Sequence, residues 1–266
     1  MFSENETSAG NIGASQRSRR RRMLAIRYAS EVAPAPHSNV NIPSPPGSDD
    51  ARTVAPTLVT SDRDRIQELL DGVDPRTWVF TGDTLGFEIQ QARRGWVEHF
   101  SDFLREKLDR KHDIILNSSV AGSTIEHLLK DVEWRILRFQ PDVVLMMPSA
   151  AECAERGADD EFRATLQQLT DRLHEEGCSV VLNTPPCPAN ASQAVTTTMK
   201  TAASRIRAVA TQSGAVLADH CSNWQATTQQ DGANANLHEE SGQQPSARGH
   251  RELARRLLKS LNIRSS

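Results

Sequence analysis

Short apolar runs alternate with longer amphipathic stretches along most of the chain. Five runs are apolar and are followed by small, polar or proline residues, which is typical of strands buried in a parallel sheet. They are Thr77–Thr81, Asp113–Asn117, Asp142–Met147, Ser179–Asn183 and Ala215–Ala218. The stretches between and after them have helical periodicity: Gly95–Arg110, Ser123–Phe139, Asp159–Glu176, Ser192–Ser213 and Ser246–Leu261. This alternation predicts strands joined by helical crossovers in an α/β domain.

The second of these crossovers carries sequence signals for both of its ends. Ser123 precedes Glu126 by three positions, which is the spacing of a capping box. Pro141 follows Phe139 closely and acts as a stop signal. We therefore expect a helical crossover with well-defined boundaries.

The first 60 residues differ in character from the rest of the chain. They are punctuated by Ser, Asn, Pro and Gly and show no sustained period of 2 or 3.6, so we interpret residues 1–60 as a disordered arm and residues 61–266 as the folded domain. Composition agrees with this division. Apolar residues make up 37% of the 266-residue chain, and even with glycine added this falls slightly under the usual share.

Charge and cysteine content exclude several classes of protein. With 31 Lys and Arg against 34 Asp and Glu, no global basic field indicates a nucleic-acid binder. No uninterrupted apolar stretch approaches the length of a transmembrane helix. The cysteines lie far apart in the sequence, which indicates reduced, mostly buried thiols rather than a zinc site or a disulfide framework: Cys153, Cys178, Cys187 and Cys221.

A basic cluster at Arg17–Arg22 precedes a short apolar run and resembles a twin-arginine export signal. Arg27 and Glu31 interrupt that run, so no usable export signal remains and we expect a cytoplasmic protein. The cluster could instead hold an anionic partner such as RNA or an anionic lipid surface. No aromatic residues interleave to stack bases. Two alternatives remain open. The arm could be only a solubilising tail, or translation could start at Met23 so that the cluster is not part of the protein.

The turns after the predicted strands matter most, because a doubly wound sheet binds ligands beyond the carboxyl ends of its strands. Thr81–Leu85 (TGDTL) resembles the GDSL block of the SGNH hydrolases, in which a serine at the place of Thr84 attacks an ester carbonyl. Asn117–Thr124 resembles the second block, whose glycine, here Gly122, directs its N–H into the oxyanion hole.

Three further segments also resemble this family, and the resemblance covers residues 77–262 in the expected order. They are Gly95-Trp96, Gln140–Val144 and Pro245–His250. The resemblance implies a three-layer α/β/α sandwich with a five-stranded parallel sheet in the flavodoxin-like order 2-1-3-4-5. It also implies an esterase or deacetylase that acts on small acyl groups, often on carbohydrates, without a metal or an organic cofactor.

The reactive positions depart from the family pattern. The family places a D-x-x-H pair directly before the proline that opens the last helix, which puts Gln244 at the histidine place and Ser241 at the aspartate place. Glutamine cannot accept a proton near neutral pH, and serine has no charge to orient an imidazole. The general base is therefore absent from its expected position.

The third block departs as well. The family writes G-x-N-D where this chain has Pro148–Ala151, so the oxyanion asparagine is replaced by Ala150. Losing one such donor typically costs ~10²–10³ in rate. Thr84 adds a methyl group that restricts the nucleophile. Among the four positions that give the family its letters, only Gly122 matches.

Other residues could in principle supply the missing chemistry. A loop could deliver His238 to Thr84 as a substitute base, although a solvent-exposed loop histidine is the expected reading. Asp219-His220 resembles a catalytic dyad, but neighbours on an extended segment point to opposite faces, so we interpret His220 as a satisfied structural histidine. His250 is expected to cap or pack within the last helix. Asp83 is expected to accept backbone N–H bonds from neighbouring loops.

Three hypotheses follow from these residues. The first is a catalytically degenerate pseudoenzyme whose pocket around Thr84, Gly122, Ala150 and Gln244 binds an acyl or sugar ligand or a partner. The second is a weak ester hydrolase with Thr84 as its nucleophile. The third is a scaffold whose basic arm is the functional part.

Overall fold

The computed structural model describes residues 61–83, 94–187, 191–231, 236–239 and 244–263. They form one parallel sheet with the strand order β2-β1-β3-β4-β5. The strands are β1 (Thr77–Gly82), β2 (Ile114–Asn117), β3 (Val143–Met147), β4 (Ser179–Asn183) and β5 (Val216–Ala218). The predicted strands and their order are therefore confirmed.

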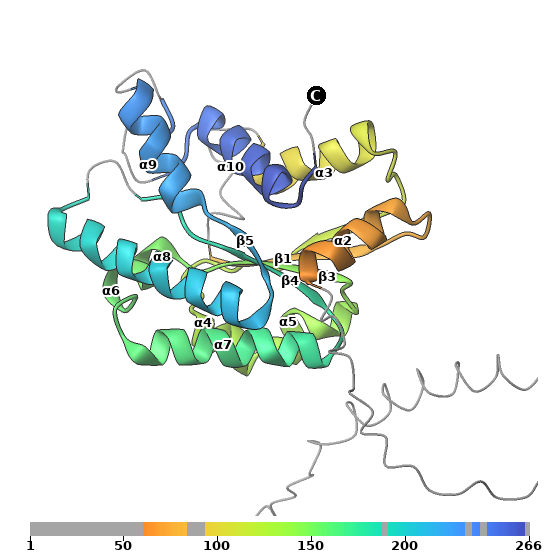
Figure 1. Cartoon of the computed structure of the whole chain (residues 1–266), viewed down its shortest axis with the longest axis horizontal. Helices are drawn as coiled ribbons and strands as arrows, with labels where there is room; N and C mark the ends of the chain where they lie inside the picture. The colour runs from red at the N-terminus through yellow and green to blue at the C-terminus, as the bar shows by residue number, and fades with distance from the viewer. Residues whose placement is uncertain (1–60, 84–93, 188–190, 232–235, 240–243, 264–266) are drawn as a thin grey trace, which may run out of the picture. The chain divides into compact units, whose positions relative to one another are not determined.

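Helices cover both faces of this sheet (Figure 1). One face packs against α2 (Asp62–Asp71), α3 (Trp96–Lys107), α9 (His220–Asp231) and α10 (Ala247–Ser260). The other face packs against α4 (Ile125–Lys130), α5 (Val132–Arg135), α7 (Asp160–Glu175) and α8 (Gln193–Ser213). The short helix α6 (Ala150–Glu155) lies beside α8, and the 3-10 turn η2 (Leu137–Phe139) precedes β3. The result is the three-layer α/β/α sandwich that was expected.

Alternation along the central strand explains how one strand serves two cores. Trp78 and Phe80 of β1 belong to the cluster under α3 and α10, whereas Val79 belongs to the cluster under α4 and α7. Successive strand residues point to opposite faces, so a strand covered on both sides must be apolar throughout. Phe80 and Phe100 of α3 meet edge to face at 5.4 Å between ring centroids.

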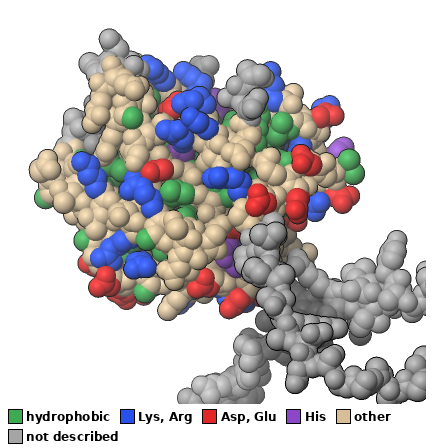
Figure 2. Space-filling view, in the orientation of Figure 1, with side chains coloured by type: hydrophobic (Ala, Val, Ile, Leu, Met, Phe, Trp, Pro, Cys, Tyr) green, Lys and Arg blue, Asp and Glu red, His purple; other side chains and the backbone are tan. Residues whose placement is uncertain are grey.

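The last helix separates apolar and basic side chains on its two sides. Its buried side packs on the sheet, and its outer side exposes Arg248, Arg251, Arg255 and Lys259. Figure 2 shows this basic group on the surface where α10 lies in Figure 1. Within the described ranges, no helix is long and apolar enough to cross a membrane.

The second crossover differs from its prediction. It is broken into α4, α5 and η2 instead of forming one helix. The predicted capping box of Ser123 with Glu126 is wrong, because Thr124 is the N-cap and accepts from the N–H of His127 at 3.2 Å. The Ser123 hydroxyl accepts from the guanidinium of Arg135 instead. That contact withdraws Ser123 from capping and leaves the neighbouring hydroxyl to start the helix.

Three helices were not expected from the pattern, namely α2, α6 and α9. Helix α9 begins at His220, one residue after the end of β5, so the prediction that His220 lies on an extended segment is wrong. The segment contains few apolar residues, with Cys221 and Trp224 as the buried ones. Such a sequence has no clear helical periodicity, and its fold depends on tertiary contacts.

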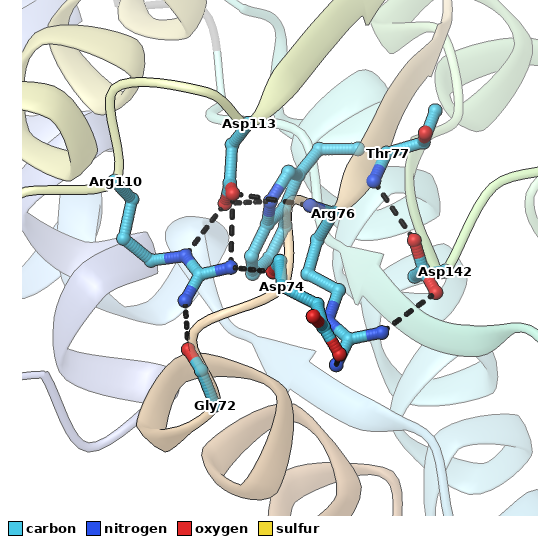
Figure 3. Close-up of polar contacts among 8 residues, drawn as sticks. Gly72, Asp74, Arg76, Thr77, Arg110, Asp113 and Asp142 are labelled. Carbon is cyan, nitrogen blue, oxygen red and sulfur yellow. Dashed lines mark hydrogen bonds and ion pairs between the residues drawn. The ribbon is translucent and has the colours of Figure 1, made fainter.

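Two aspartates join the strands at the amino end of the sheet (Figure 3). Asp113, just before β2, accepts from the indole N–H of Trp78 at 2.9 Å and from the backbone N–H of Arg76 at 3.1 Å. It also forms a two-oxygen contact with the guanidinium of Arg110, at 2.8 and 2.9 Å. Asp142, just before β3, accepts from the N–H of Thr77 at 2.9 Å. The start of β1 is thus held from both sides.

Candidate functional site

The loops that follow β1 and β2 meet at the carboxyl end of the sheet. Asp83 follows β1, and its Oδ1 accepts from the backbone N–H of Gly122 at 2.6 Å. The expectation that Asp83 accepts a backbone N–H from a neighbouring loop is therefore confirmed. Asn117 likewise accepts from the N–H of Ser119 at 3.1 Å, in the turn that leads to Gly122.

Glycine is needed where β1 ends. Gly82 has φ of +141°, and a Cβ built there would lie 2.0 Å from the carbonyl oxygen of Met147. The last residues of β1 and β3 are paired across this approach. No side chain fits here without moving the backbone. The glycine therefore allows the ends of β1 and β3 to approach each other closely where their loops begin.

Arg135 of α5 reinforces the loop between β2 and α4. Its guanidinium donates to the carbonyl oxygen of Ser118 at 3.0 Å and to the hydroxyl of Ser123. The backbone N–H of Val120 donates to the carbonyl of Gly82 at 3.1 Å. The turn that carries Gly122 is thus fixed from β1, from α5 and from Asp83.

The loop after β3 begins α6 and brings a second carboxylate to this region. Ser149 caps α6 by accepting from the N–H of Glu152 at 2.8 Å. Ala150, predicted from the sequence to hold the family's oxyanion asparagine position, is the first residue of the helix and offers only a methyl group. The backbone N–H of Ile125, at the start of α4, lies 3.1 and 3.2 Å from the two carboxylate oxygens of Glu152.

Burial dominates the electrostatics of Glu152. Desolvation raises the pKa of this carboxyl group to about 6, against the N–H bond from Ile125 and the charge of Arg156, which lower it. The nearby carboxylate of Asp83 contributes to the increase. Sequence reasoning missed this residue. The S-x-x-E spacing of Ser149 and Glu152 indicates a capping box, but the carboxylate bonds to α4 instead.

Gln244 lies at the end of a short paired segment before α10. Its carbonyl accepts from the N–H of Glu239 at 2.9 Å, next to an antiparallel bridge between His238 and Pro245. Ser246 then caps α10 by accepting from the N–H of Gly249 at 3.1 Å. The backbone at this position is therefore well anchored, and its side chain is a neutral amide.

The ring of His238 packs into the protein. It is half-buried, so the expectation of a solvent-exposed loop histidine is wrong. Its Nε2 lies 3.1 Å from the carbonyl oxygen of Cys187, and the indole Nε1 of Trp224 lies 3.2 Å from Nε2 and 3.5 Å from Nδ1. If Nε2 carries the proton, its N–H donates to the carbonyl of Cys187, and the unprotonated Nδ1 can accept from the indole N–H of Trp224. Burial lowers the pKa of this histidine.

The other two histidines considered from the sequence are structural. His220 is fully buried with its Nε2 3.1 Å from Oδ1 of Asn183, and desolvation lowers its pKa to about 3. His250 is buried in α10, and desolvation lowers its pKa to about 4. Asp219 forms an ion pair with Arg207 at 2.8 Å. The interpretation of His220 as a structural histidine is supported by its burial and by its contact with Asn183.

The described part of the site thus joins Asp83 to Gly122 and brings Glu152 to the start of α4. Thr84 and Ser241 lie outside the described residues, so their predicted roles stay predictions. Among the residues that are described, no group of three or more His, Cys, Asp or Glu side chains is placed to hold a metal ion. What the described loops offer is a backbone N–H, two carboxylates and, at Ala150 and Gln244, neutral side chains.

Residues 80–252 match the model of the GDSL-like lipase/acylhydrolase family, and the chain belongs to this family. The match begins within β1 and ends in α10, so it covers the last part of β1, the other four strands and the loops described above. A comparison with curated proteins gives no match.

Solved structures with the same fold include acetylxylan esterase Axe2 of Geobacillus stearothermophilus. It is 19% identical, with a TM-score of 0.60 over 72% of this chain and 97% of the other. A catalytic mutant of Axe2 gives 21% identity and a TM-score of 0.62 over the same shares. LAE5, an alpha/beta hydrolase enzyme from the metagenome of Lake Arreo, Spain, is 19% identical, with a TM-score of 0.61 over 72% of this chain and 97% of the other. At these identities the similarity establishes the fold.

Proposed function

We propose that this chain is an SGNH-type pseudoenzyme that binds a small acyl group or an acylated sugar without hydrolysing it. The observation that carries the proposal is the 2.6 Å hydrogen bond from the N–H of Gly122 to the carboxylate of Asp83. Gly122 holds the place from which the family stabilises an oxyanion, and here its N–H already has an anionic acceptor.

This contact opposes ester hydrolysis in two ways. Oxyanion stabilisation needs donors that aim at the oxygen on which charge develops. The donor of Gly122 is engaged, and the carboxylate that engages it would repel a second negative charge. Ala150 supplies no side-chain donor in compensation.

The general base is also missing from the residues that are described. Gln244 has no basic nitrogen. His238 directs its ring toward Cys187 and Trp224, and its lowered pKa reduces its power to accept a proton. A threonine hydroxyl without a base is a weak nucleophile. The residual rate of about 10³–10⁴ over water that survives the removal of triad members elsewhere depends on an intact oxyanion hole, and here the Gly122 donor is engaged by Asp83.

The ligand class is proposed from the relatives. Axe2 is named as an acetylxylan esterase, and an acetylated xylo-oligosaccharide is accordingly the first ligand to test. Loss of the reactive groups need not abolish ligand binding. The reaction depends on particular side chains, whereas the fold can keep the surrounding loops in place without them. The loop backbones around Gly122 and Ala150 are firmly held, which favours a preformed site.

The test uses the full chain beside its Thr84→Val variant. We expect hydrolysis of p-nitrophenyl acetate and of acetylated xylo-oligosaccharides at the buffer rate for both proteins. We expect the acetylated oligosaccharide, and not the deacetylated one, to raise the thermal midpoint. Hydrolysis that is lost on Thr84→Val would overturn the proposal in favour of a weak ester hydrolase. An unchanged midpoint at saturating oligosaccharide would overturn the proposed ligand.

A further inference from the structure

Two cysteines that are far apart in the sequence meet beyond the carboxyl ends of β4 and β5. Cys187 follows β4, and Cys221 lies in the first turn of α9. Their sulfur atoms are 3.2 Å apart. The sequence spacing gave no sign of this pair, because 34 residues separate the two thiols.

The backbone around both sulfurs is fixed by neighbouring strands. The N–H of Cys221 donates to the hydroxyl of Thr184 at 2.9 Å, and the N–H of Thr184 donates to the carbonyl of Ala218 at 3.1 Å. These bonds join the ends of β4 and β5 directly beside the thiols. A disulfide bond is about 2.05 Å long, so the sulfurs need to approach by only about 1 Å.

The two thiols have different environments. Cys187 is 8% exposed, whereas Cys221 is 2% exposed, so an oxidant from solvent reaches Cys187 first. The contact with Cys221, the amide of Gln225 and the charge of Lys200 lower the pKa of Cys187 despite burial. The contact with Cys187 and burial raise the pKa of Cys221. The fraction of Cys187 present as the nucleophilic thiolate at neutral pH is therefore larger than that of an ordinary cysteine.

We propose that Cys187 and Cys221 form a dithiol site that a hydroperoxide oxidises to a disulfide. The thiolate of Cys187 attacks one peroxide oxygen, the O–O bond breaks, and an alcohol or water leaves while Cys187 becomes a sulfenic acid. The sulfur of Cys221 then attacks the sulfenic sulfur. The S–S bond forms, the S–O bond breaks, and the hydroxide leaves as water with the proton of Cys221. Two thiols and one hydroperoxide thus give one disulfide, one alcohol and one water.

Oxidation would act on the segment that carries His238. The carbonyl oxygen of Cys187 lies within hydrogen-bond distance of this histidine, and the indole of Trp224 in α9 packs edge to face with its ring at 5.2 Å between centroids. A Cys187–Cys221 bond would join the loop after β4 covalently to α9 and restrain both neighbours of His238. The oxidised protein is expected to unfold at a higher temperature, by several degrees. This inference does not depend on the proposed function.

The experiment treats the full chain with one equivalent of hydrogen peroxide, blocks the remaining thiols with N-ethylmaleimide and maps the peptides by mass spectrometry. We expect one pair of peptides linked through Cys187 and Cys221, two hydrogens lighter than the reduced pair and released by dithiothreitol. In Cys221→Ser, the sulfenic acid of Cys187 should persist and react with dimedone. Cys178→Ala, which removes a buried cysteine at the amino end of β4, should form the same disulfide as the unaltered chain.

The pH dependence of alkylation supplies a readout that needs no variant. The rate at which iodoacetamide modifies Cys187 should rise through a midpoint below that of an ordinary cysteine, because the pKa of Cys187 is lowered. Absence of the linked peptides in the unaltered chain would overturn the proposal. So would an alkylation midpoint near that of an ordinary cysteine, at about pH 8.5.

Discussion

The carboxyl group of Glu152 is subject to opposing influences. Burial disfavours its charge, while the N–H of Ile125 and the charge of Arg156 favour it, and burial prevails. Its pKa of about 6 in the folded protein exceeds the value of 4.5 for a free side chain. The folded state therefore holds the proton more tightly than the unfolded state between these two pH values.

The sign of the resulting pH effect follows from linkage. As the pH rises from 4 to 7, ionisation of Glu152 should lower the free energy of unfolding by about 2 kcal/mol. Glu152→Gln cannot ionise, so the difference in stability between the variant and the unaltered chain should shift by that amount in favour of the variant. Urea unfolding at pH 4 and pH 7 measures this shift. An equal difference at both pH values would contradict the burial argument.

The ion pair of Arg110 and Asp113 is buried at the other end of the sheet, with side chains 6% and 2% exposed. Asp113→Ala should lower the free energy of unfolding by about 3–5 kcal/mol, because it leaves a buried guanidinium without its partner. A double variant, Arg110→Met with Asp113→Leu, should lose less than Asp113→Ala alone. Chemical denaturation gives the free energy of unfolding of the unaltered chain, of Asp113→Ala and of the double variant.

A surface charge in the same turn supplies the control for that prediction. Lys111 is exposed and forms an ion pair with the exposed Asp109 at 2.6 Å. Lys111→Ala should leave the unfolding midpoint unchanged, since exposed pairs contribute little. A loss at Lys111 similar to that at Asp113 would show that the turn itself, rather than the buried charge, is the sensitive feature.

The ends of the strands differ in how much they tolerate a side chain. Gly82→Ala places a Cβ 2.0 Å from a backbone oxygen and should cost at least about 3 kcal/mol. Gly122 also has a positive φ, of +74°, but nothing lies within 4 Å of its missing Cβ. Gly122→Ala should therefore cost only the conformational strain, about 1–2 kcal/mol. Equal unfolding midpoints for the two variants would show that the contact with Met147 is relieved by a small backbone shift.

Elements with a strong local pattern could be predicted, and those that depend on distant contacts could not. The runs around Val79, Val144 and Val180 are apolar on both faces, which identified the buried strands. Helix α9 lacks such periodicity. The capping register at Ser123 and Thr124 depends on Arg135, 12 residues from Ser123, whose guanidinium engages the serine.

The candidate site was predicted in part for the same reason. The family motifs located Asp83 and Gly122 and predicted that Asp83 accepts a backbone N–H from a neighbouring loop. They did not predict that the donor is the N–H of Gly122, which was expected to point into the oxyanion hole. The role of Glu152 depends on an N–H 27 residues away. The half-buried position of His238 depends on Cys187, 51 residues away. No local pattern encodes such pairs.

At the scale of the whole molecule, the proposed loss of catalysis should be reversible in part. A variant with Thr84→Ser, Ala150→Asn, Ser241→Asp and Gln244→His restores the nucleophile, one oxyanion donor and the acid-base pair. A positioned base contributes about 10²–10⁴, and an oxyanion donor about 10²–10³. Hydrolysis of p-nitrophenyl acetate should therefore rise by at least about 10² over the unaltered chain, even with Gly122 bonded to Asp83.

The matched control carries the first three substitutions with Gln244 unchanged. It should remain near the buffer rate, because a hydroxyl without a base is a poor nucleophile. Circular dichroism establishes that both variants are folded. If the variant with all four substitutions is folded and still hydrolyses the ester only at the buffer rate, the loops rather than the replaced side chains prevent the reaction.

The aspartates that hold the start of β1 also bear on how the chain folds. The central strand pairs with partners from distant parts of the sequence, and its N–H groups at Arg76 and Thr77 find their carboxylates 37 and 65 residues away. Such pairing is slow, since long loops must close before any contact forms. A strand apolar on both faces could dock one residue out of place at little hydrophobic cost. Asp113 and Asp142 accept only in the native alignment, so misaligned intermediates would leave two carboxylates unbonded and would be less prone to persist as kinetic traps.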